Sequence, residues 1–374
     1  MFKDYLISDV LPFWLNHAID TEHGGIMTCL DENGELYDEE KSVWFQGRAL
    51  YTFASCYNQV EQTDAYLQAA KTIYDFLPRC ADESGRLAFT VTRQGQPIQK
   101  RRYYFSETFA AIGCCEYYLA TGDEQAHERA EMWFDIAYRL YRDPSLTTPK
   151  FNPETAPYHA LSPAMILLAT AQVMRQIDRD KYDAVAKEMV PEILLHLTEY
   201  GLLENVSKDG AFINTATGRT VNPGHSLEAA WFLMAEGEYQ HDPALMQAGK
   251  TIIDHAMRYG YKNGGIIAFC DCLGKPAKAL EWDMYLWWPQ CEAMIAHALA
   301  YRLFGEERYR TTLEELKAFA FSHFADSKHG EWYGYLHYDG TVANRLKGNI
   351  FKGPFHLPRM LMLLDKLERG QALL

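Results

Sequence analysis

The chain has 374 residues, and its 50 acidic and 36 basic side chains give a formal net charge of −14. This charge disfavours a nucleic-acid partner, because a phosphate backbone binds a concentrated basic face and the longest basic cluster is residues 100–102. No apolar run reaches the length of a membrane span, and residues 1–15 lack the basic start of a signal peptide. We therefore expect a cytoplasmic globular protein without a membrane partner.

The eight cysteines are scattered along the chain, and without a secretory signal they are expected to be reduced thiols. Cys270 and Cys272 form a close pair, but no second pair lies near them in sequence, which argues against a zinc site. Aromatic residues make up 14% of the chain. They either fill a core or, in a cleft, pack on the C–H face of a sugar, and composition alone does not separate the two uses.

Six segments share one layout, in which a polar turn with glycine precedes a short alternating stretch and an aromatic-rich helix start. They span residues 23–48, 84–107, 150–163, 209–228, 264–292 and 329–359. The third segment is the most degenerate. Length alone suggests two or three domains, but a repeat of about sixty residues indicates one domain over residues 1–374.

Two kinds of helix are expected between these segments. Amphipathic helices, with charges on one face, are predicted at 65–76, 124–141, 180–198, 243–259 and 307–324. Helices that are apolar on every side, and therefore buried on every side, are predicted at 50–56, 109–118, 165–173, 229–235, 293–300 and 360–364.

The lengths of the connections predict the topology. Each buried helix is followed by a very short turn, whereas each amphipathic helix is followed by a connection of about twenty residues or more, which is long for a compact domain. Long connections usually carry function, and here they all gather at one end. We predict an all-α (α/α)6 barrel of six helical hairpins, with short β-hairpin loops at that end.

One polar position recurs where the inner helices begin. It is occupied by Arg48, Glu107, Ser162, Glu228, Glu292 and Arg359. Three positions earlier stand Phe45, Tyr104, His159, His225, Pro289 and His356. Positions i and i+3 share a helix face, so both sets are expected to face the mouth of the barrel. Burying such groups is costly without partners or a substrate, so their recurrence indicates a functional site.

Each of these side chains also has a structural interpretation. His225 and Glu228 fit a helix cap or half of a di-iron site, but the second half is missing because Arg359 follows His356, so we expect no metal. His356 also fits a hydrogen-bonded core histidine, and Glu292 fits a helix cap. Arg48 also fits a structural ion pair. His159, in the weakest repeat, is more typical of a structural residue.

Three long motifs carry a family resemblance. They are Asn222-Pro223-Gly224-His225-x-x-Glu228, Leu286-Trp287-Trp288-Pro289 and Phe351-Lys352-Gly353-x-Phe355-His356-x-Pro358-Arg359. With these motifs the sequence resembles the N-acylglucosamine 2-epimerase family, which includes the renin-binding proteins, over nearly its whole length. The resemblance implies an (α/α)6 barrel that interconverts N-acetylglucosamine and N-acetylmannosamine.

The resemblance also implies roles for individual residues. It assigns acid–base catalysis to His225 and His356, with Arg48, Glu228 and Glu292 as their polar partners. We expect further residues of the matched motifs to bind the sugar, namely Trp44, Glu107, Trp288, Gln290 and Lys352.

The sequence departs from the family pattern in two places, which bear on the role of a cysteine and on regulation by ATP. Pro354 stands where the mammalian relatives have cysteine, so a role for that thiol is not shared. The family is stimulated by ATP, but residues 145–157, at the matching place, contain no glycine-rich phosphate cradle. We expect no required cofactor, ATP at most as an allosteric activator, and a homodimer by analogy.

The chemistry of C2 inversion agrees with a histidine pair. The sugar ring opens, a base removes the C2 proton to give an enediolate-like intermediate, and an acid returns a proton to the other face. Histidine suits either role at neutral pH, and Arg48 is suited to stabilise the oxyanion. The alternatives are an aldose–ketose isomerase acting on mannose, a cellobiose or mannose 2-epimerase, an inverting glycosidase that uses Glu228 and Glu292, and a non-enzymatic binding protein.

Overall fold

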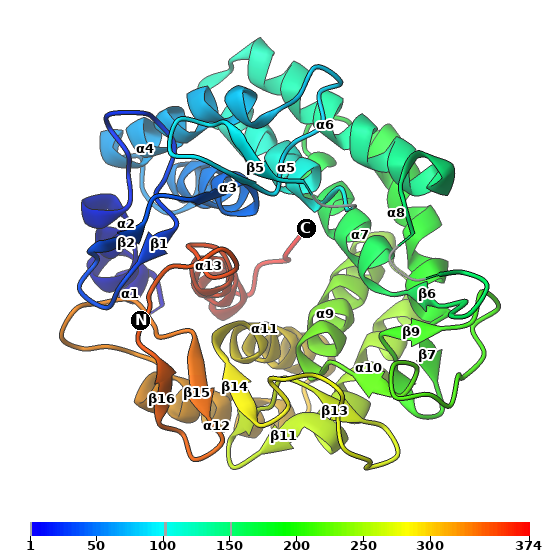
Figure 1. The fold of residues 1–374 in the computed structure, drawn as a ribbon. Coiled ribbons are helices and arrows are strands. Elements are labelled where there is room, and N and C mark those ends of the chain that lie inside the picture. The colour runs from blue at the N-terminus through cyan, green and yellow to red at the C-terminus, as the bar shows by residue number, and fades with distance from the viewer. Residues whose placement is uncertain (1, 101–102, 150–151) are drawn as a thin grey trace.

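A ring of helices surrounds a central axis in the computed structural model, which describes residues 2–100, 103–149 and 152–374 (Figure 1). Two predicted features, the basic positions Arg101 and Arg102 and the start of the third repeat at Lys150 and Phe151, lie outside the described residues. The inner helices are α3 (Val43–Gln59), α5 (Phe105–Thr121), α7 (Ser162–Met174), α9 (Pro223–Gln240), α11 (Trp287–Phe304) and α13 (His356–Glu368).

The outer helices alternate with the inner ones along the chain. Five of them are α4 (Asp64–Phe76), α6 (Glu124–Arg142), α8 (Arg179–Leu194), α10 (Pro243–Gly260) and α12 (Glu307–His323). The N-terminal run completes the outer ring beside α13 and consists of α1 (Phe2–Tyr5), the π-helix η1 (Leu6–Val10) and α2 (Leu11–His17). The predicted (α/α)6 barrel is therefore confirmed.

Local sequence signals explain where the helices begin and end. The side chains of Asp123, Asn222 and Asp242 accept hydrogen bonds from backbone N–H groups in the first turns of α6, α9 and α10, as N-cap residues do. Gly122 and Gly305 follow α5 and α11 with φ of 70° and 67°, a conformation that favours glycine. These C-caps produce the very short turns from inner to outer helices.

One predicted helix is shorter than expected. The expectation for α8 was residues 180–198, but the helix ends at Leu194. Pro191 removes a helical N–H donor near this end, and Leu197–Thr198 (β7) instead pairs with Gly201–Leu202 (β8) as an antiparallel hairpin. The amphipathic pattern of the sequence therefore continues beyond the end of the helix, into residues that form a β-hairpin.

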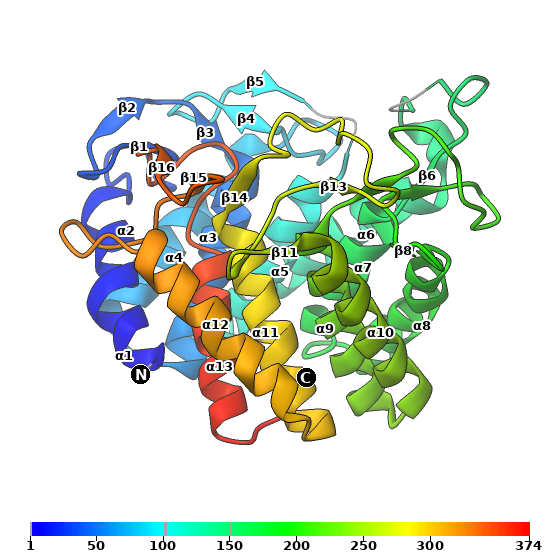
Figure 2. The ribbon, with the colours of Figure 1, turned by 90° about the horizontal axis from the view of Figure 1, so that it is seen from below.

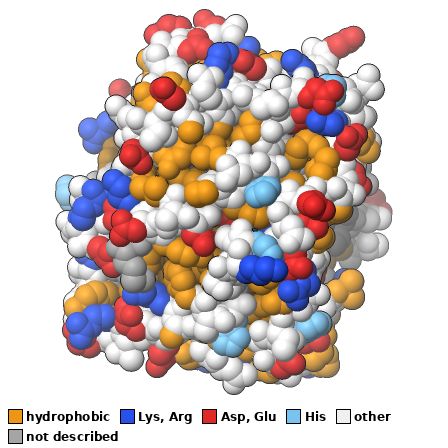
Figure 3. Space-filling view, turned by 90° about the vertical axis from the view of Figure 1, so that its left-hand side faces the viewer, with side chains coloured by type: hydrophobic (Ala, Val, Ile, Leu, Met, Phe, Trp, Pro, Cys, Tyr) orange, Lys and Arg blue, Asp and Glu red, His pale blue; other side chains and the backbone are white. Residues whose placement is uncertain are grey.

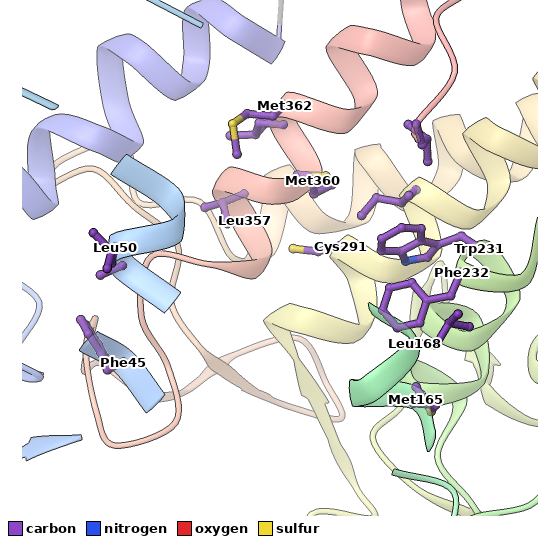
Figure 4. Packing of buried hydrophobic residues seen from close by; sticks show 14 of the residues in the cluster. Phe45, Leu50, Met165, Leu168, Trp231, Phe232, Cys291, Leu357, Met360 and Met362 are labelled. Atoms are coloured by element: carbon purple, nitrogen blue, oxygen red, sulfur yellow. The ribbon is translucent and has the colours of Figure 1, made fainter. Parts of the chain in front are cut away.

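The core lies between the inner helices and between the two rings. Figure 4 shows Met165 and Leu168 of α7 close to Phe232 of α9, and Leu357 and Met360 on α13. Leu168, Met360 and Leu357 are at most 1% exposed. The inner helices are thus buried over most of their surface, as their apolar composition predicted.

Short strands form a rim at one end of the barrel, which lies at the top of Figure 2. Hairpins within one connection pair β1 (Cys29–Leu30) with β2 (Leu36–Asp38), β4 (Thr90–Val91) with β5 (Pro97–Gln99), β7 with β8, β11 (Tyr261–Lys262) with β12 (Gly265–Ile266), and β15 (Tyr335–His337) with β16 (Val342–Asn344). Two 3-10 turns, η2 (Leu77–Cys80) and η3 (Pro144–Leu146), follow α4 and α6.

Further strand pairs join connections of neighbouring repeats. All are antiparallel, and they pair β3 (Lys41–Ser42) with β4, β6 (His159–Ala160) with β9 (Asn205–Val206), β10 (Thr220–Val221) with β13 (Cys270–Asp271), and β14 (Met284–Leu286) with β15. Backbone hydrogen bonds from Lys347 N to Leu30 O (3.0 Å) and from Leu30 N to Gly348 O (3.2 Å) join the last connection to the first. The rim therefore helps to close the ring.

Two buried lysines repeat one arrangement in the first and last connections. Lys41 Nζ donates to Asp20 Oδ2 (2.8 Å) and to Gly24 O (2.7 Å). Lys347 Nζ lies 3.1 Å from Asp326 Oδ2 and donates to Gly330 O (2.7 Å). Both lysine side chains have no exposed surface, so removing either partner would leave an uncompensated buried charge.

The surface is mixed in charge, and acidic and basic side chains are interspersed on the face shown in Figure 3. Among the residues that the structure describes, no helix combines the length and apolarity needed to cross a membrane.

Candidate functional site

A cavity of about 970 Å³ runs along the barrel axis between the inner helices. Lining residues recur at spacings of three and four on each helix, so they fall into layers from the rim downwards. The first layer contains Trp44, Phe105, Ser162, His225, Trp288 and His356. The second contains Arg48, Phe109, Ile166, Glu228 and Arg359. The third contains Tyr51, Ile112, Ala169, Phe232 and Leu363, and the fourth contains Glu116, Val173 and Lys366.

His356 is held by a buried carboxylate. Its Nδ1 lies 2.7 Å from Glu292 Oε1, and Glu292 has no exposed surface. A carboxylate only accepts hydrogen bonds, so Nδ1 carries the proton and Nε2 has a free lone pair in the neutral ring. Burial and the positive charges of Arg359 and Arg48 lower the pKa of His356 well below its ordinary value. His356 is therefore a neutral imidazole suited to act as a base.

His225 is held in the same way by a different carboxylate. Its Nδ1 lies 2.9 Å from Glu204 Oε1, and its side chain is 30% exposed. Burial alone would lower its pKa, but the negative charge of Glu204 and its hydrogen bond, with Glu228 and Glu292, raise the pKa above the ordinary value. His225 therefore holds its proton more firmly than His356 and is suited to act as an acid.

Both histidines face one indole. The ring centroid of Trp288 lies 5.1 Å from that of His225 and 5.7 Å from that of His356. An acid and a base of opposite pKa shift are thus placed around one part of the cavity, which is the arrangement needed to exchange a proton between two faces of a carbon.

Arg359 joins the remaining carboxylates. Its Nη2 donates to Glu228 Oε1 (2.6 Å) and to Glu292 Oε1 (2.8 Å). Glu228, Glu292 and His356 would form a set of metal ligands by distance, but the guanidinium already supplies the cation between the two carboxylates. Trp231 Nε1 also donates to Glu292 Oε2 (2.8 Å). Glu292 is therefore fully engaged in positioning its neighbours and does not itself line the cavity.

Arg48 presents hydrogen-bond donors that the protein does not fully use. Its guanidinium carbon lies 4.1 Å from the ring centroid of Phe109 and 5.1 Å from that of Phe355. Its Nη1 reaches Phe351 O at 3.4 Å, while its buried Nε has no hydrogen-bond partner among the described residues. Burial lowers the pKa of Arg48 to about 9, which leaves it charged at neutral pH. These donors are available to an oxygen atom of a ligand.

Three predicted sugar-binding residues, Gln290, Glu107 and Lys352, do not line the cavity. Gln290 is fully buried and bonds to backbone groups of Ile266, with Ile266 N donating to Oε1 (2.8 Å) and Nε2 donating to Ile266 O (2.7 Å). Gln46 fixes Ile26 in the same way in the first repeat. Gln290 therefore fastens the rim to an inner helix.

Glu107 and Lys352 have similar structural roles. Glu107 Oε1 accepts hydrogen bonds from Arg86 Nε (2.6 Å) and Leu87 N (3.0 Å), and the side chain has no exposed surface. Lys352 Nζ is fully buried and donates to Glu331 Oε1 (3.1 Å) and Lys347 O (2.9 Å). Both charges are compensated within the protein, and neither side chain lines the cavity.

Most of the other predicted residues line the cavity, and two do not. Trp44, Arg48, His225, Glu228, Trp288 and His356 line it, and Glu292 lies directly behind. His159 lies apart on β6, where it stacks on His196 and pairs with Glu192 at 3.2 Å.

The sequence analysis assigned no role to three residues of the site. Arg359 occupied the recurring polar position but was not assigned a role, and Glu204 belongs to a connection that carries no regular pattern. Trp231 was indistinguishable from a core tryptophan. For Arg359 the recurrence itself indicated a role. The partnership of Glu204 with His225 instead depends on how the fold places the residue between β8 and β9 beside α9.

A family model described as N-acylglucosamine 2-epimerase (GlcNAc 2-epimerase) matches residues 24–352 of this chain. The chain belongs to this family. N-acylglucosamine 2-epimerase of Rattus norvegicus is 35% identical to it, over 96% of this chain and 90% of the relative. Membership of the N-acylglucosamine 2-epimerase family makes the chain an isomerase of the epimerase class.

Solved structures share the fold of this epimerase. A D-mannose isomerase superposes with a TM-score of 0.86 at 18% identity, covering 98% of this chain and 97% of the other. The cellobiose 2-epimerase from Bacillus thermoamylovorans gives a TM-score of 0.83 at 22% identity, covering 98% of both chains. At these identities the likeness shows a common fold and nothing finer about the substrate.

Proposed function

We propose that this protein interconverts N-acetylglucosamine and N-acetylmannosamine by inverting the configuration at C2. The observation that carries the proposal is the pair His225 and His356, each held by its own carboxylate and shifted in pKa in opposite directions. The 35% identity to the rat N-acylglucosamine 2-epimerase supports the choice of an amino sugar.

The proposed reaction begins with the open-chain sugar, in which the C1 carbonyl makes the C2 proton acidic. His356 Nε2 takes this proton, and the electron pair moves into the C1 carbonyl to give an enediolate-like intermediate. Arg48 donates to the developing oxyanion. His225 then returns a proton to C2 from the opposite face, which leaves the product with inverted configuration.

The two histidines balance the protons in this scheme. One imidazole gains the proton that C2 loses, and the other imidazole loses the proton that C2 gains. Oxidation state does not change, so the chemistry itself requires no redox cofactor. Glu292 and Glu204 keep the two rings in the orientation and tautomer that each step needs.

The test is proton NMR of N-acetylglucosamine incubated with the purified protein in deuterated water, with and without ATP. N-acetylmannosamine should accumulate, carrying deuterium at C2. A spectrum with neither N-acetylmannosamine nor loss of the C2 proton signal would overturn the proposal. The arm with ATP determines whether the nucleotide activates the enzyme, and our proposal is that turnover does not require it.

The main alternative is an aldose–ketose isomerase, because protonation of the same intermediate at C1 yields a ketose. Incubation with mannose and detection of fructose distinguishes the two activities, and cellobiose tests the disaccharide branch. We further propose that the protein acts in the cytoplasm and forms a homodimer, by analogy with the family. Light scattering of the purified protein measures the oligomeric state.

A further inference from the structure

The connection between β13 and β14 directs one acidic side chain into the cavity. Residues 272–283 form neither helix nor strand and lie at the rim of the barrel (Figure 2). Glu281 lines the cavity and is partly buried. Its neighbours Leu280 and Trp282 are 89% and 56% exposed. The connection therefore turns its charge inward and its large apolar side chains into solvent, which is the reverse of the arrangement that burial favours.

The carboxylate of Glu281 lacks a partner within the protein. Among residues 2–100, 103–149 and 152–374, none forms a hydrogen bond or an ion pair with its oxygen atoms. Partial burial removes water from a charged group, and this costs free energy unless hydrogen bonds replace the water. A carboxylate only accepts hydrogen bonds, so a ligand that carries hydroxyl groups would supply the missing donors.

Tyr335 adds a hydroxyl group to the lining of the mouth. It lies on β15, opposite Leu286 of β14, and its ring centroid is 5.7 Å from that of Trp287. Asn349 Nδ2 donates to the phenolic oxygen (3.3 Å), so the hydroxyl proton is available to a ligand. Burial raises the pKa of Tyr335, and the negative charge of Glu281 adds to this effect. The mouth therefore offers an acceptor and a donor, which are the two functions that hydroxyl groups of a ligand satisfy.

The proposed reaction determines which end of the sugar meets these groups. C2 lies between His225 and His356 in the first layer, and the C1 oxygen reaches Arg48 in the second layer, which is further from the rim. The chain from C3 to C6 therefore runs in the other direction, towards the mouth. Its hydroxyl groups at C4 and C6 thus approach Glu281 and Tyr335.

We propose that Glu281 is a substrate-binding residue that selects sugars by accepting a hydrogen bond from the hydroxyl group at C4 or C6, with Tyr335 as a donor at the same mouth. This inference rests on the proposed function. A hydrogen bond at this end of the sugar lies far from the reacting carbon, so it stabilises the ground state and the transition state equally. Its loss therefore raises KM and leaves kcat nearly unchanged.

The experiment compares N-acetylglucosamine with its 4-deoxy and 6-deoxy analogues, using the parent enzyme and Glu281→Ala, with epimerisation followed by NMR. In the parent, loss of the bonded hydroxyl group should lower kcat/KM about tenfold or more, as expected for a hydrogen bond to a charged group. In Glu281→Ala, KM for N-acetylglucosamine should rise by a similar factor, while kcat stays within about threefold. The deoxy sugars should then equal N-acetylglucosamine within about twofold, because the variant has no carboxylate to lose contact with.

Two further variants complete the design. Glu281→Gln keeps the shape of the side chain and one acceptor oxygen but removes the charge, so KM should rise by less than in Glu281→Ala. Asp283→Asn removes an exposed carboxylate from the same connection and is the matched control. It should alter neither KM nor kcat.

The outcomes separate the two proposals. An unchanged KM in Glu281→Ala, or a parent enzyme that processes both deoxy sugars as well as N-acetylglucosamine, would overturn the inference and leave the proposed function intact. A variant that loses the same factor on all three sugars would also overturn the inference, because the carboxylate would then act without contacting either hydroxyl group. Failure of the parent to epimerise N-acetylglucosamine would overturn the proposed function and the inference with it.

Discussion

The charge of Glu204 should set the pH range in which the enzyme works. Glu204→Gln keeps a hydrogen-bond acceptor beside His225 Nδ1 but removes the negative charge that raises the pKa of this histidine. The acid form of His225 would then be lost at a lower pH. The variant is therefore expected to lose activity at pH values where the parent enzyme is still active.

The energy of the interaction follows from the distance between Glu204 and His225 and from the exposure of their side chains to solvent. With 2.9 Å between Glu204 Oε1 and His225 Nδ1, the charge centres are about 4 Å apart, and such a pair interacts by about 1 kcal/mol in water and about 4 kcal/mol near a protein surface. The side chains are 16% and 30% exposed, so solvent screens part of this energy. The expected interaction is therefore intermediate, about 2 kcal/mol, and its loss lowers the pKa of His225.

The sign of the effect is set by the proton that His225 must carry. Its pKa is raised in the native enzyme, so kcat/KM should fall as pH increases through that raised value. In Glu204→Gln the alkaline limb should move to lower pH, while activity below both pKa values is retained. The assay is the pH profile of kcat/KM, which reports groups of the free enzyme.

A matched control separates charge from general disturbance. Glu192→Gln removes the carboxylate of another carboxylate–histidine pair, with His159, which lies outside the cavity. Its pH profile should equal that of the parent. An alkaline limb that stays in place in Glu204→Gln, or that moves equally in both variants, would refute the assignment of His225 as the acid.

Three further predictions test the remaining assignments. His356→Asn should reduce kcat by about 10²–10⁴-fold and abolish deuterium exchange at C2, and exchange at the parent rate would exclude His356 as the base. Arg48→Met should reduce kcat on the order of 10²-fold, as for loss of an oxyanion donor; an increase in KM alone would instead indicate simple binding. Gln290→Ala should destabilise the fold by about 1–3 kcal/mol in urea denaturation, because Ile266 loses its buried partners. The variant should retain kcat. A tenfold lower kcat at parental stability would show that Gln290 acts in the site.

The repeat predicted the architecture because loop lengths and helix composition are local properties of the chain. It also predicted the two histidines, since His225 and His356 stand at equivalent places in regular repeats. Glu107 does not line the cavity, because the equivalence fails in the second repeat. There the cavity face of α5 carries Phe105 and Phe109, and a residue two positions away from either points to nearly the opposite side of the helix.

The same geometry explains why Gln290 does not line the cavity. It precedes Glu292 by two residues, so its side chain leaves the helix on another side, the one that faces the rim. Lys352 lies in an irregular connection just before α13, where no periodicity predicts direction. The partnership of Glu204 with His225 is likewise tertiary, because the two residues are 21 positions apart and lie on different elements.

Closure of the ring has a consequence for the order of events during synthesis. His356 and Arg359 lie on the last helix, whereas Arg48 lies on the first inner helix, and contacts such as Trp14 Nε1 to Glu331 Oε2 join residues 317 positions apart. Contacts of this separation form late, after most of the chain has been ordered. The nascent polypeptide therefore stays inactive until its final helix docks, and the first appearance of epimerisation marks the completed barrel.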